Sequence, residues 1–200
     1  MLRKAALVMT QRVRRAWFFA AIFAISAPAC GEGTEVQSPA SLGLGPWNER
    51  ARYIFDDNIE PAAVGFTMDA PSARSDRFLR ERAQTAELVA RLKVRTVTID
   101  TIGDESTYHL GVEVIPPVLV PGRPLKDTTM ELVIRPTSPA HGIAKALDQR
   151  MQGTTFIGFV HRFASPDGTE TELHWHLSPD NADVLDAVKE AVVLGEASSR

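Results

Sequence analysis

The sequence predicts an α+β domain in which about five mostly antiparallel strands carry helices packed on one face. Three observations lead to this prediction. After residue 93 the spacing of apolar residues changes from a helical period of about 3.6 to a strand period of about 2. Short turns that contain glycine then separate strand patterns, which is typical of hairpins. Two later strand patterns each lead through Ser-Pro into a helical pattern.

Two helices are expected before the sheet begins. Residues 47–57 place apolar side chains on one side of a short helix. A longer helix is expected from its N-cap, Ser75, to residue 93, with Asp76 in the first turn. The acidic run at residues 56–60 is interpreted as a solvated helix end, because it lacks the spacing and the glycine of an EF-hand calcium loop.

The strand patterns follow in order along the chain, and the first two flank Gly103-Asp104, which predicts a hairpin. Residues 116–124 contain four prolines and are expected to form a loop. The five expected strands are residues 94–102, 106–115, 129–135, 155–164 and 169–177. In the second of them the residues expected to face the core are Tyr108, Leu110, Val112 and Val114.

Two further helices are predicted where a strand pattern ends in Ser-Pro. Ser138 and Ser178 are the expected N-caps, and the proline after each suits the first helical position because no N–H is needed there. Gly153 and Gly195 are expected to end these two helices.

The last hairpin, formed within residues 155–177, has two possible registers. A three-residue loop pairs Ser165 with Thr169, whereas a four-residue loop pairs Ala164 with Thr169. We expect the three-residue loop, because Ser165 precedes a proline and therefore avoids the α region. Gly168 suits the left-handed position of the bulge that such a loop contains.

This register decides how the histidines are interpreted, because a slip of one residue moves every side chain to the other face. In the expected register His161 lies on the core face, where a hydrogen bond satisfies it, while His174 and His176 lie on a solvated face. In the four-residue register all three histidines share a face and would suit zinc. We therefore expect His174 and His176 to be surface residues without a metal. His141, near a helix start, is likewise expected to face solvent.

A metal site at His174 and His176 remains the alternative. Glu172 lies on the same face and is the candidate third ligand or base. His109 and Glu113 would complete such a site only if their strand lay beside the strand of His174. The sequence contains no nucleophile elbow, P-loop, dinucleotide fingerprint or Cys-His pair.

One apolar tripeptide is a candidate contact surface. Val118, Leu119 and Val120 lie between prolines, and a stiff apolar loop costs little conformational entropy to order on binding. It would contact a partner protein or an apolar ligand. The alternative is that these residues fold back on the core.

The first thirty residues indicate export. Five basic residues precede an apolar run at residues 16–27, which is shorter than a bilayer-spanning helix requires. Ala27-Pro28-Ala29-Cys30 follows. This stretch resembles the signal of bacterial lipoproteins, in which a cysteine after small residues is lipidated and becomes the mature N-terminus. The resemblance covers residues 1–30 and implies a signal peptide of residues 1–29 with a lipid on Cys30.

Three other interpretations of this segment stay open: a plain secretory signal, an uncut N-terminal anchor, and a twin-arginine signal at Arg14-Arg15. Either Met1 or Met9 is the start. The lipoprotein resemblance accounts for the cysteine count, because Cys30 is the single cysteine of the chain and has no partner for an internal disulfide.

The net charge of the remaining chain limits the classes of partner that it can bind. Without the five basic residues of the signal, 17 of the 22 basic residues remain, against 25 acidic residues. The formal net charge of the remaining chain is therefore −8. This balance argues against binding to nucleic acid or anionic lipids. Residues 30–46 are predicted to be the lipidated cysteine and a flexible tether, and residues 47–200 a single domain.

The sequence therefore predicts a lipid-anchored protein of the bacterial cell envelope that faces the periplasm. Gly31 after Cys30 favours the outer over the inner membrane, by the sorting rule that the lipoprotein resemblance implies. We expect a non-catalytic binding module for a partner protein or a small apolar ligand, without a cofactor. The alternatives are a metal-dependent hydrolase that uses His174 and His176, and a purely structural envelope lipoprotein.

Overall fold

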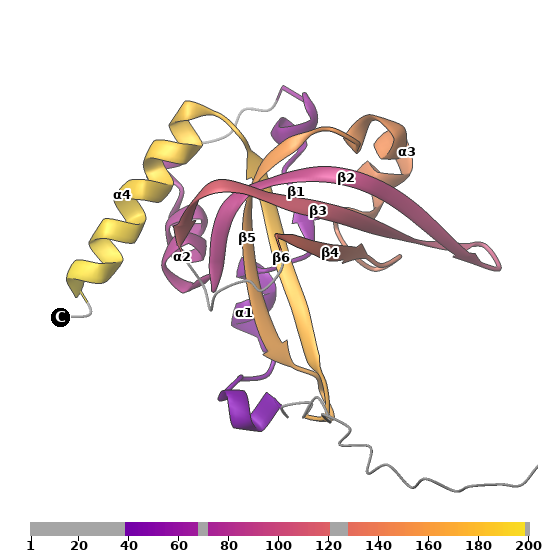
Figure 1. Cartoon of the computed structure of the whole chain (residues 1–200), viewed down its shortest axis with the longest axis horizontal. Helices are drawn as coiled ribbons and strands as arrows, with labels where there is room; N and C mark the ends of the chain where they lie inside the picture. Colours follow the sequence, from indigo (N-terminus) through magenta and orange to yellow (C-terminus); the bar gives the residue numbers. More distant parts are fainter. Residues whose placement is uncertain (1–38, 68–71, 121–127, 199–200) are drawn as a thin grey trace, which may run out of the picture. The chain divides into compact units, whose positions relative to one another are not determined.

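A six-stranded sheet forms the centre of the α+β fold, with strand order β1-β6-β5-β2-β3-β4 (Figure 1). The computed structural model describes residues 39–67, 72–120 and 128–198. Neighbouring strands are antiparallel except β1 and β6, which run parallel. The strands are β1 (Asn58–Ile59), β2 (Leu88–Ile102), β3 (Glu105–Val120), β4 (Thr129–Ile134), β5 (Thr155–Ala164) and β6 (Thr171–Pro179). The described sheet thus has one strand more than expected, and the extra strand is parallel.

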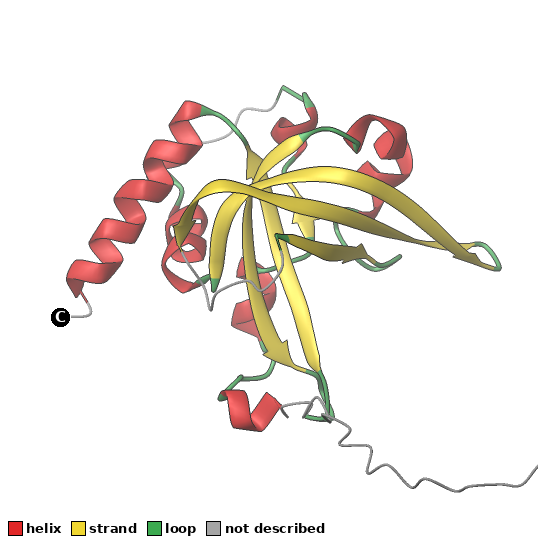
Figure 2. Cartoon of the chain, in the orientation of Figure 1, coloured by secondary structure: helices red, strands yellow, loops and turns green. Residues whose placement is uncertain are grey.

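Short helices connect and cover the strands (Figure 2). The α-helices of the described residues are α1 (Glu49–Ile54), α2 (Arg77–Thr85), α3 (His141–Met151) and α4 (Ala182–Ser198), and the 3-10 helices are η1 (Pro39–Leu42), η2 (Pro61–Val64) and η3 (Ala73–Ser75). None of the helices in the described part combines the length and the apolar character that crossing a bilayer requires.

Both faces of the sheet are buried, so the prediction of helices on one face is wrong. On one face the first core collects apolar residues from all six strands, including Leu92, Leu110 and Trp175, under α3 and η2. On the other face the second core collects Val89, Ile157 and neighbours beneath α1, α2 and α4. Because β5 is covered on both sides, its sequence is a nearly continuous apolar run rather than an alternation.

The sheet curls around the first core. Although β5, β2 and β3 lie between them in the sheet, β6 and β4 approach each other to within 8 Å in Cα–Cα distance. The hairpin of β2 and β3 turns at Gly103-Asp104, as predicted, with Gly103 at a φ of +61°. Its four inward residues, Tyr108, Leu110, Val112 and Val114, are buried as predicted.

The helix expected at residues 75–93 is wrong over its second half. Asp76, not Ser75, is the N-cap of α2, because its side chain accepts a hydrogen bond of 2.7 Å from the N–H of Phe78. The helix ends at Thr85, and β2 begins at Leu88. Residues 88–93 pair with β5 on one edge, and this long-range pairing overrides the local helical pattern.

The proline-rich segment is partly strand, which corrects the loop expected at residues 116–124. The strand β3 continues to Val120, which pairs with Val89. Pro116 and Pro117 fall in an irregularity of the ladder, between the pairs of Ile115 and Val120, where no backbone N–H is needed. Residues 121–124 lie outside the described residues.

The two Ser-Pro stretches do not cap helices as predicted. Ser138 accepts a hydrogen bond of 3.0 Å from the N–H of Arg135, and α3 begins three residues after it. Ser178 stays in β6, and Asn181 caps α4 instead. Gly153, at a φ of +85°, follows the end of α3 as predicted, whereas α4 continues past Gly195.

The described end of the predicted tether is bonded to the sheet. The carbonyl oxygen of Gly45 accepts a hydrogen bond of 2.9 Å from the N–H of Ala164, and Pro46 forms a bridge to the same residue. Residues 1–38 lie outside the described residues, and with them the predicted signal, Cys30 and most of the tether.

Gly158→Ala is expected to lower the free energy of unfolding by about 1–3 kcal/mol, the usual cost of overpacking a core. A Cβ at this position would lie 2.7 Å from Cγ of Leu92 and 3.4 Å from Cδ2 of Leu177. Urea unfolding followed by circular dichroism measures the change. Gly142→Ala is the matched control, because a Cβ there meets nothing within 4 Å. An equal effect of the two substitutions would contradict the packing described.

Candidate ligand-binding cleft

The register of β5 and β6 differs from the predicted one. Ser165 pairs with Glu170 through a hydrogen bond of 2.9 Å, which leaves a four-residue loop at residues 166–169. The side chain of Asp167 accepts hydrogen bonds from the N–H and the hydroxyl of Thr169 and from the hydroxyl of Ser165, so Thr169 is held in the loop. Gly168 does take the expected left-handed conformation, with a φ of +71°.

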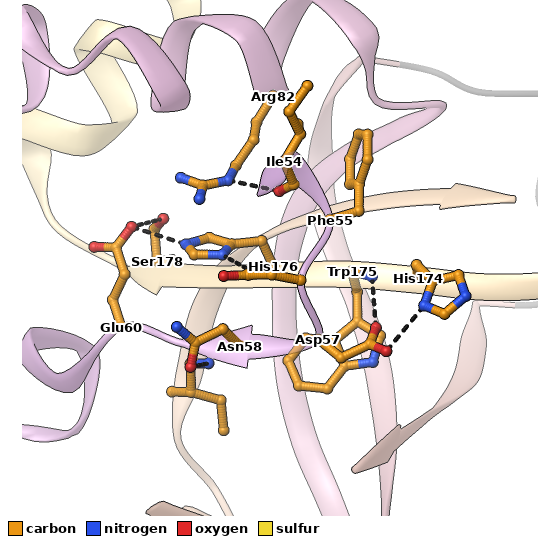
Figure 3. Close-up of polar contacts among 12 residues, drawn as sticks. Ile54, Phe55, Asp57, Asn58, Glu60, Arg82, His174, Trp175, His176 and Ser178 are labelled. Atoms are coloured by element: carbon orange, nitrogen blue, oxygen red, sulfur yellow. Dashed lines mark hydrogen bonds and ion pairs between the residues drawn. The ribbon is translucent and has the colours of Figure 1, made fainter. Parts of the chain in front are cut away.

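This register places the histidines on one face, so the prediction of surface histidines is wrong. His161 pairs with His174, and Phe159 pairs with His176. The side chains of His174 and His176 are 1% and 3% exposed. Both lie on the face of the second core, where the segment between α1 and η2 covers them (Figure 3).

Carboxylates meet both ring nitrogens of His174. Nδ1 lies 2.9 Å from Oδ2 of Asp57, and Nε2 lies 3.3 Å from Oε2 of Glu172. The ring stacks on Trp47 with centroids 3.5 Å apart and planes inclined by 10°. Asp57 itself is buried at a φ of +50°, and its Oδ1 accepts a hydrogen bond from the N–H of Trp175.

His176 is enclosed in the same way. Nδ1 lies 2.7 Å from Oδ1 of Asp56, and Nε2 lies 3.0 Å from Oε1 of Glu60. Ser178 donates a further hydrogen bond of 2.6 Å to Oε1 of Glu60. A carboxylate oxygen therefore lies within hydrogen-bond distance of each ring nitrogen of His176.

Glu60 is stabilised as a carboxylate. Burial acts to raise its pKa, but the hydrogen bonds from His176 and Ser178 and the charges of His176 and Arg82 act in the opposite direction. The net result is a pKa below the ordinary value of Glu.

Arg82 is the buried cation beside this cluster. The residue is 6% exposed, and its Nε donates a hydrogen bond of 2.8 Å to the carbonyl oxygen of Ile54 at the end of α1. Burial lowers the pKa of Arg82, against the raising effect of Asp56 and Glu60. Among the described residues no acceptor is hydrogen-bonded to its two terminal nitrogens, and no carboxylate forms an ion pair with them.

Of these groups, Asp56, Glu60, Arg82 and His176 line a cleft of about 640 Å³, whereas His174 does not. Its wall is formed by the N-terminal turns of α2 and α4, by β1 and by the end of β6. The polar and charged lining residues are Asp56, Asn58, Glu60, Ser72, Asp76, Arg82, His176, Asn181 and Asp183, and the apolar ones are Pro61, Ala62, Ala73, Phe78, Leu79, Pro179 and Val184. The volume falls within the range of about 300–1,000 Å³ typical of small-molecule sites.

The structure does not assemble the candidate metal ligands into one site. His109 contacts Asp100 and Glu131, and Glu113 is paired with Arg95, all on strands separated from β6. Within the described ranges no group of three His, Cys, Asp or Glu side chains has metal-binding geometry. A metal at His176 would have to displace a carboxylate from one of its nitrogens.

The two remaining histidines lie outside the cleft. His161 faces the second core as predicted and stacks on Phe55. It has the expected hydrogen bond, with the backbone of Thr85, although its Nδ1 is buried without a partner among the described residues. Burial lowers the pKa of His161 below its ordinary value. His141 is half-buried, and its Nε2 contacts the carbonyl oxygen of Ser106.

No family model matches the chain, and neither a curated protein nor a solved structure is significantly similar to it. The function therefore has to be argued from the residues of the cleft.

Sequence reasoning missed the residues that complete the cleft. The run at 56–60 was interpreted as a solvated helix end, yet its acids bind the buried histidines. One signal was available: Asp56, Asn58 and Glu60 recur with the period of a strand, as His174 and His176 do. Nothing in the local sequence distinguishes Arg82 from the other arginines of its helix.

Glu60 makes the stability depend on pH in a defined direction. Because its pKa is lower in the folded than in the unfolded state, its contribution is present above the ordinary value of 4.5 and is lost as the pH falls through the folded value. In urea unfolding between pH 7 and pH 3, we expect Glu60→Gln to reduce the loss of stability below pH 4.5. An unchanged acid slope in the variant would contradict the hydrogen bonds described for Glu60.

Proposed function

We propose that this protein is a lipid-anchored binding domain of the bacterial cell envelope, and that the cleft between α2 and α4 holds its ligand. The observation that carries the proposal is the polar floor of the cleft. His176 and Glu60 are fixed by buried hydrogen bonds, whereas none of the described residues accepts a hydrogen bond from the terminal nitrogens of Arg82. Groups locked by their neighbours before binding are what a specific site requires.

The cleft supports a polar rather than a purely apolar ligand. Charged side chains of both signs line it, and apolar side chains lie between them. The small apolar ligand expected from the sequence is replaced in this proposal by a ligand with polar groups. Few well-placed polar groups in a partly apolar cleft fix the orientation of a small molecule.

The apolar tripeptide gives weaker support for a second contact surface. Val118 is 36% exposed, while Leu119 and Val120 are half-buried and pack on the second core. Most of this candidate surface therefore serves the core, and the proposal for a partner protein rests on Val118 alone.

The anchoring part of the proposal rests on the sequence. Basic residues, an apolar run and small residues precede Cys30, in the order that the lipoprotein resemblance describes. The remaining chain has a formal net charge of −8, from 17 basic and 25 acidic residues, so a lipid rather than the protein surface would hold it at a membrane. Gly31, the residue after Cys30, favours the outer membrane as the location of the protein.

Cys30→Ala is expected to release the protein from the membrane fraction of the cells that make it. Stable anchoring needs the acyl chains, since the acidic domain has no attraction of its own to anionic lipid. Fractionation and the mass of the N-terminal peptide measure the outcome. An unmodified Cys30 in the wild type, or a variant that stays at the membrane, would refute the anchor.

A thermal-shift screen of small molecules tests the binding function on the full chain in detergent. A ligand at one hundred times its Kd stabilises the folded state by about 2.7 kcal/mol, which raises Tm by about 5–10 °C. Ala62→Trp is expected to abolish the shift, because Ala62 is exposed and lines the cleft. A shift that persists in this variant would place binding elsewhere.

Zinc belongs in the same screen, because it separates the binding function from the hydrolase alternative. We expect no rise in Tm with zinc, since both ring nitrogens of His174 and of His176 are engaged by carboxylates. A rise that His176→Ala removes would favour the metal-dependent hydrolase instead.

A further inference from the structure

Among the described residues, none accepts a hydrogen bond from the terminal nitrogens of Arg82. The residue is 6% exposed, and one of its five N–H groups is bonded to Ile54. The terminal nitrogens point away from Ile54, toward the side on which Glu60 and Ser178 lie (Figure 3). Since Arg82 lines the cleft, these donors are available to a ligand.

Within the described residues the nearby carboxylates accept no hydrogen bond from Arg82, and the bonds that they do accept come from His176 and Ser178. Oδ1 of Asp56 is bonded to His176, and Oε1 of Glu60 receives both His176 and Ser178. Arg82 is the cation that lies beside these acids, and its planar guanidinium offers charged donors in the floor of the cleft. A carboxylate fits such donors with two parallel hydrogen bonds.

The rim of the cleft is acidic. Asp183 is exposed in the first turn of α4, and Asp76 caps α2 with one carboxylate oxygen only. A cationic group on the ligand would lie near these two acids, while an anion with two negative charges would be repelled by them. The rim thus favours a ligand that carries an ammonium group as well as its carboxylate.

Apolar side chains also line the cleft. Leu79 and Val184 are buried, and Phe78 and Ala62 are exposed. These side chains offer apolar contacts to the body of a ligand.

We infer that the cleft binds a zwitterionic ligand, an amino acid or short peptide with apolar side chains, through its carboxylate at Arg82 and its ammonium group at Asp183. This inference rests on the proposed function, because it takes the cleft as the ligand site. It adds the chemical class of the ligand and the two residues that select it.

Isothermal titration calorimetry on the full chain in detergent tests the inference with four probes. Trileucine carries both charges, its C-terminal amide lacks the carboxylate, N-acetyl-trileucine lacks the ammonium group, and free leucine tests the amino-acid form. Trileucine or leucine is expected to bind. Loss of either charge is expected to weaken binding at least tenfold, because each charge has a dedicated partner.

Asp183→Asn is the decisive variant, because Asp183 is exposed and its substitution leaves the core intact. It should weaken trileucine binding severalfold and leave N-acetyl-trileucine unaffected. Asp186→Asn is the matched control on the same helix; Asp186 is exposed, pairs with Lys189 and does not line the cleft. Arg82→Lys should weaken the free acid and not the amide, with folding checked by circular dichroism.

Equal affinities for the acid and the amide would overturn the inference, as would equal effects of Asp183→Asn and Asp186→Asn. If none of the four probes binds, while another molecule gives a thermal shift that Ala62→Trp abolishes, the ligand class is wrong and the proposed function stands. If the thermal shifts of all ligands persist in Ala62→Trp, the inference and the proposed cleft fail together.

Discussion

The architecture of this domain depends on how it buries two imidazoles on one strand. Each buried polar group that lacks a partner costs about 1–3 kcal/mol, and His174 and His176 together present four ring nitrogens. Carboxylates meet all four, and three of these acids come from residues 56–60. That segment reaches the histidines because β1 lies parallel to β6, with Asn58 opposite His176. The position of β1 at this edge of the sheet therefore depends on hydrogen bonds more than on an apolar pattern.

The same pairing prepares the cleft. The segment that covers the histidines leaves α1 through Ile54, whose carbonyl oxygen holds Arg82 of α2. The helix α2 is thereby tied to the segment as well as packed on the second core. A ligand would meet side chains whose positions are already determined by buried contacts, so little conformational entropy is lost on binding. Rigidity here follows from the way the histidines are satisfied.

Local chemistry determined what could be predicted from the sequence. The α+β class, the turn at Gly103-Asp104 and the left-handed Gly168 each follow from neighbours in the chain. The register of β5 and β6 does not follow from neighbours in this way. The side chain of Asp167 binds Thr169 and so lengthens the loop by one residue, which backbone preferences alone do not require. The cleft was not predicted for a further reason. A polar strand face indicates exposure to solvent only when no distant segment covers it and supplies hydrogen-bond partners. Here residues 56–60 supply those partners.

The parallel contact of β1 with β6 joins residues far apart in the sequence. Asp57 and His174 are separated by 117 positions, and Asp56 and His176 by 120. A chain that emerges from its N-terminus exposes residues 56–60 long before their imidazole partners exist, and closing so long a loop slows folding. The hairpins of the sheet can assemble from contacts within the growing chain, but the cleft cannot. The cleft is thus complete only in the finished domain, and a partly synthesised chain lacks the side chains that form it.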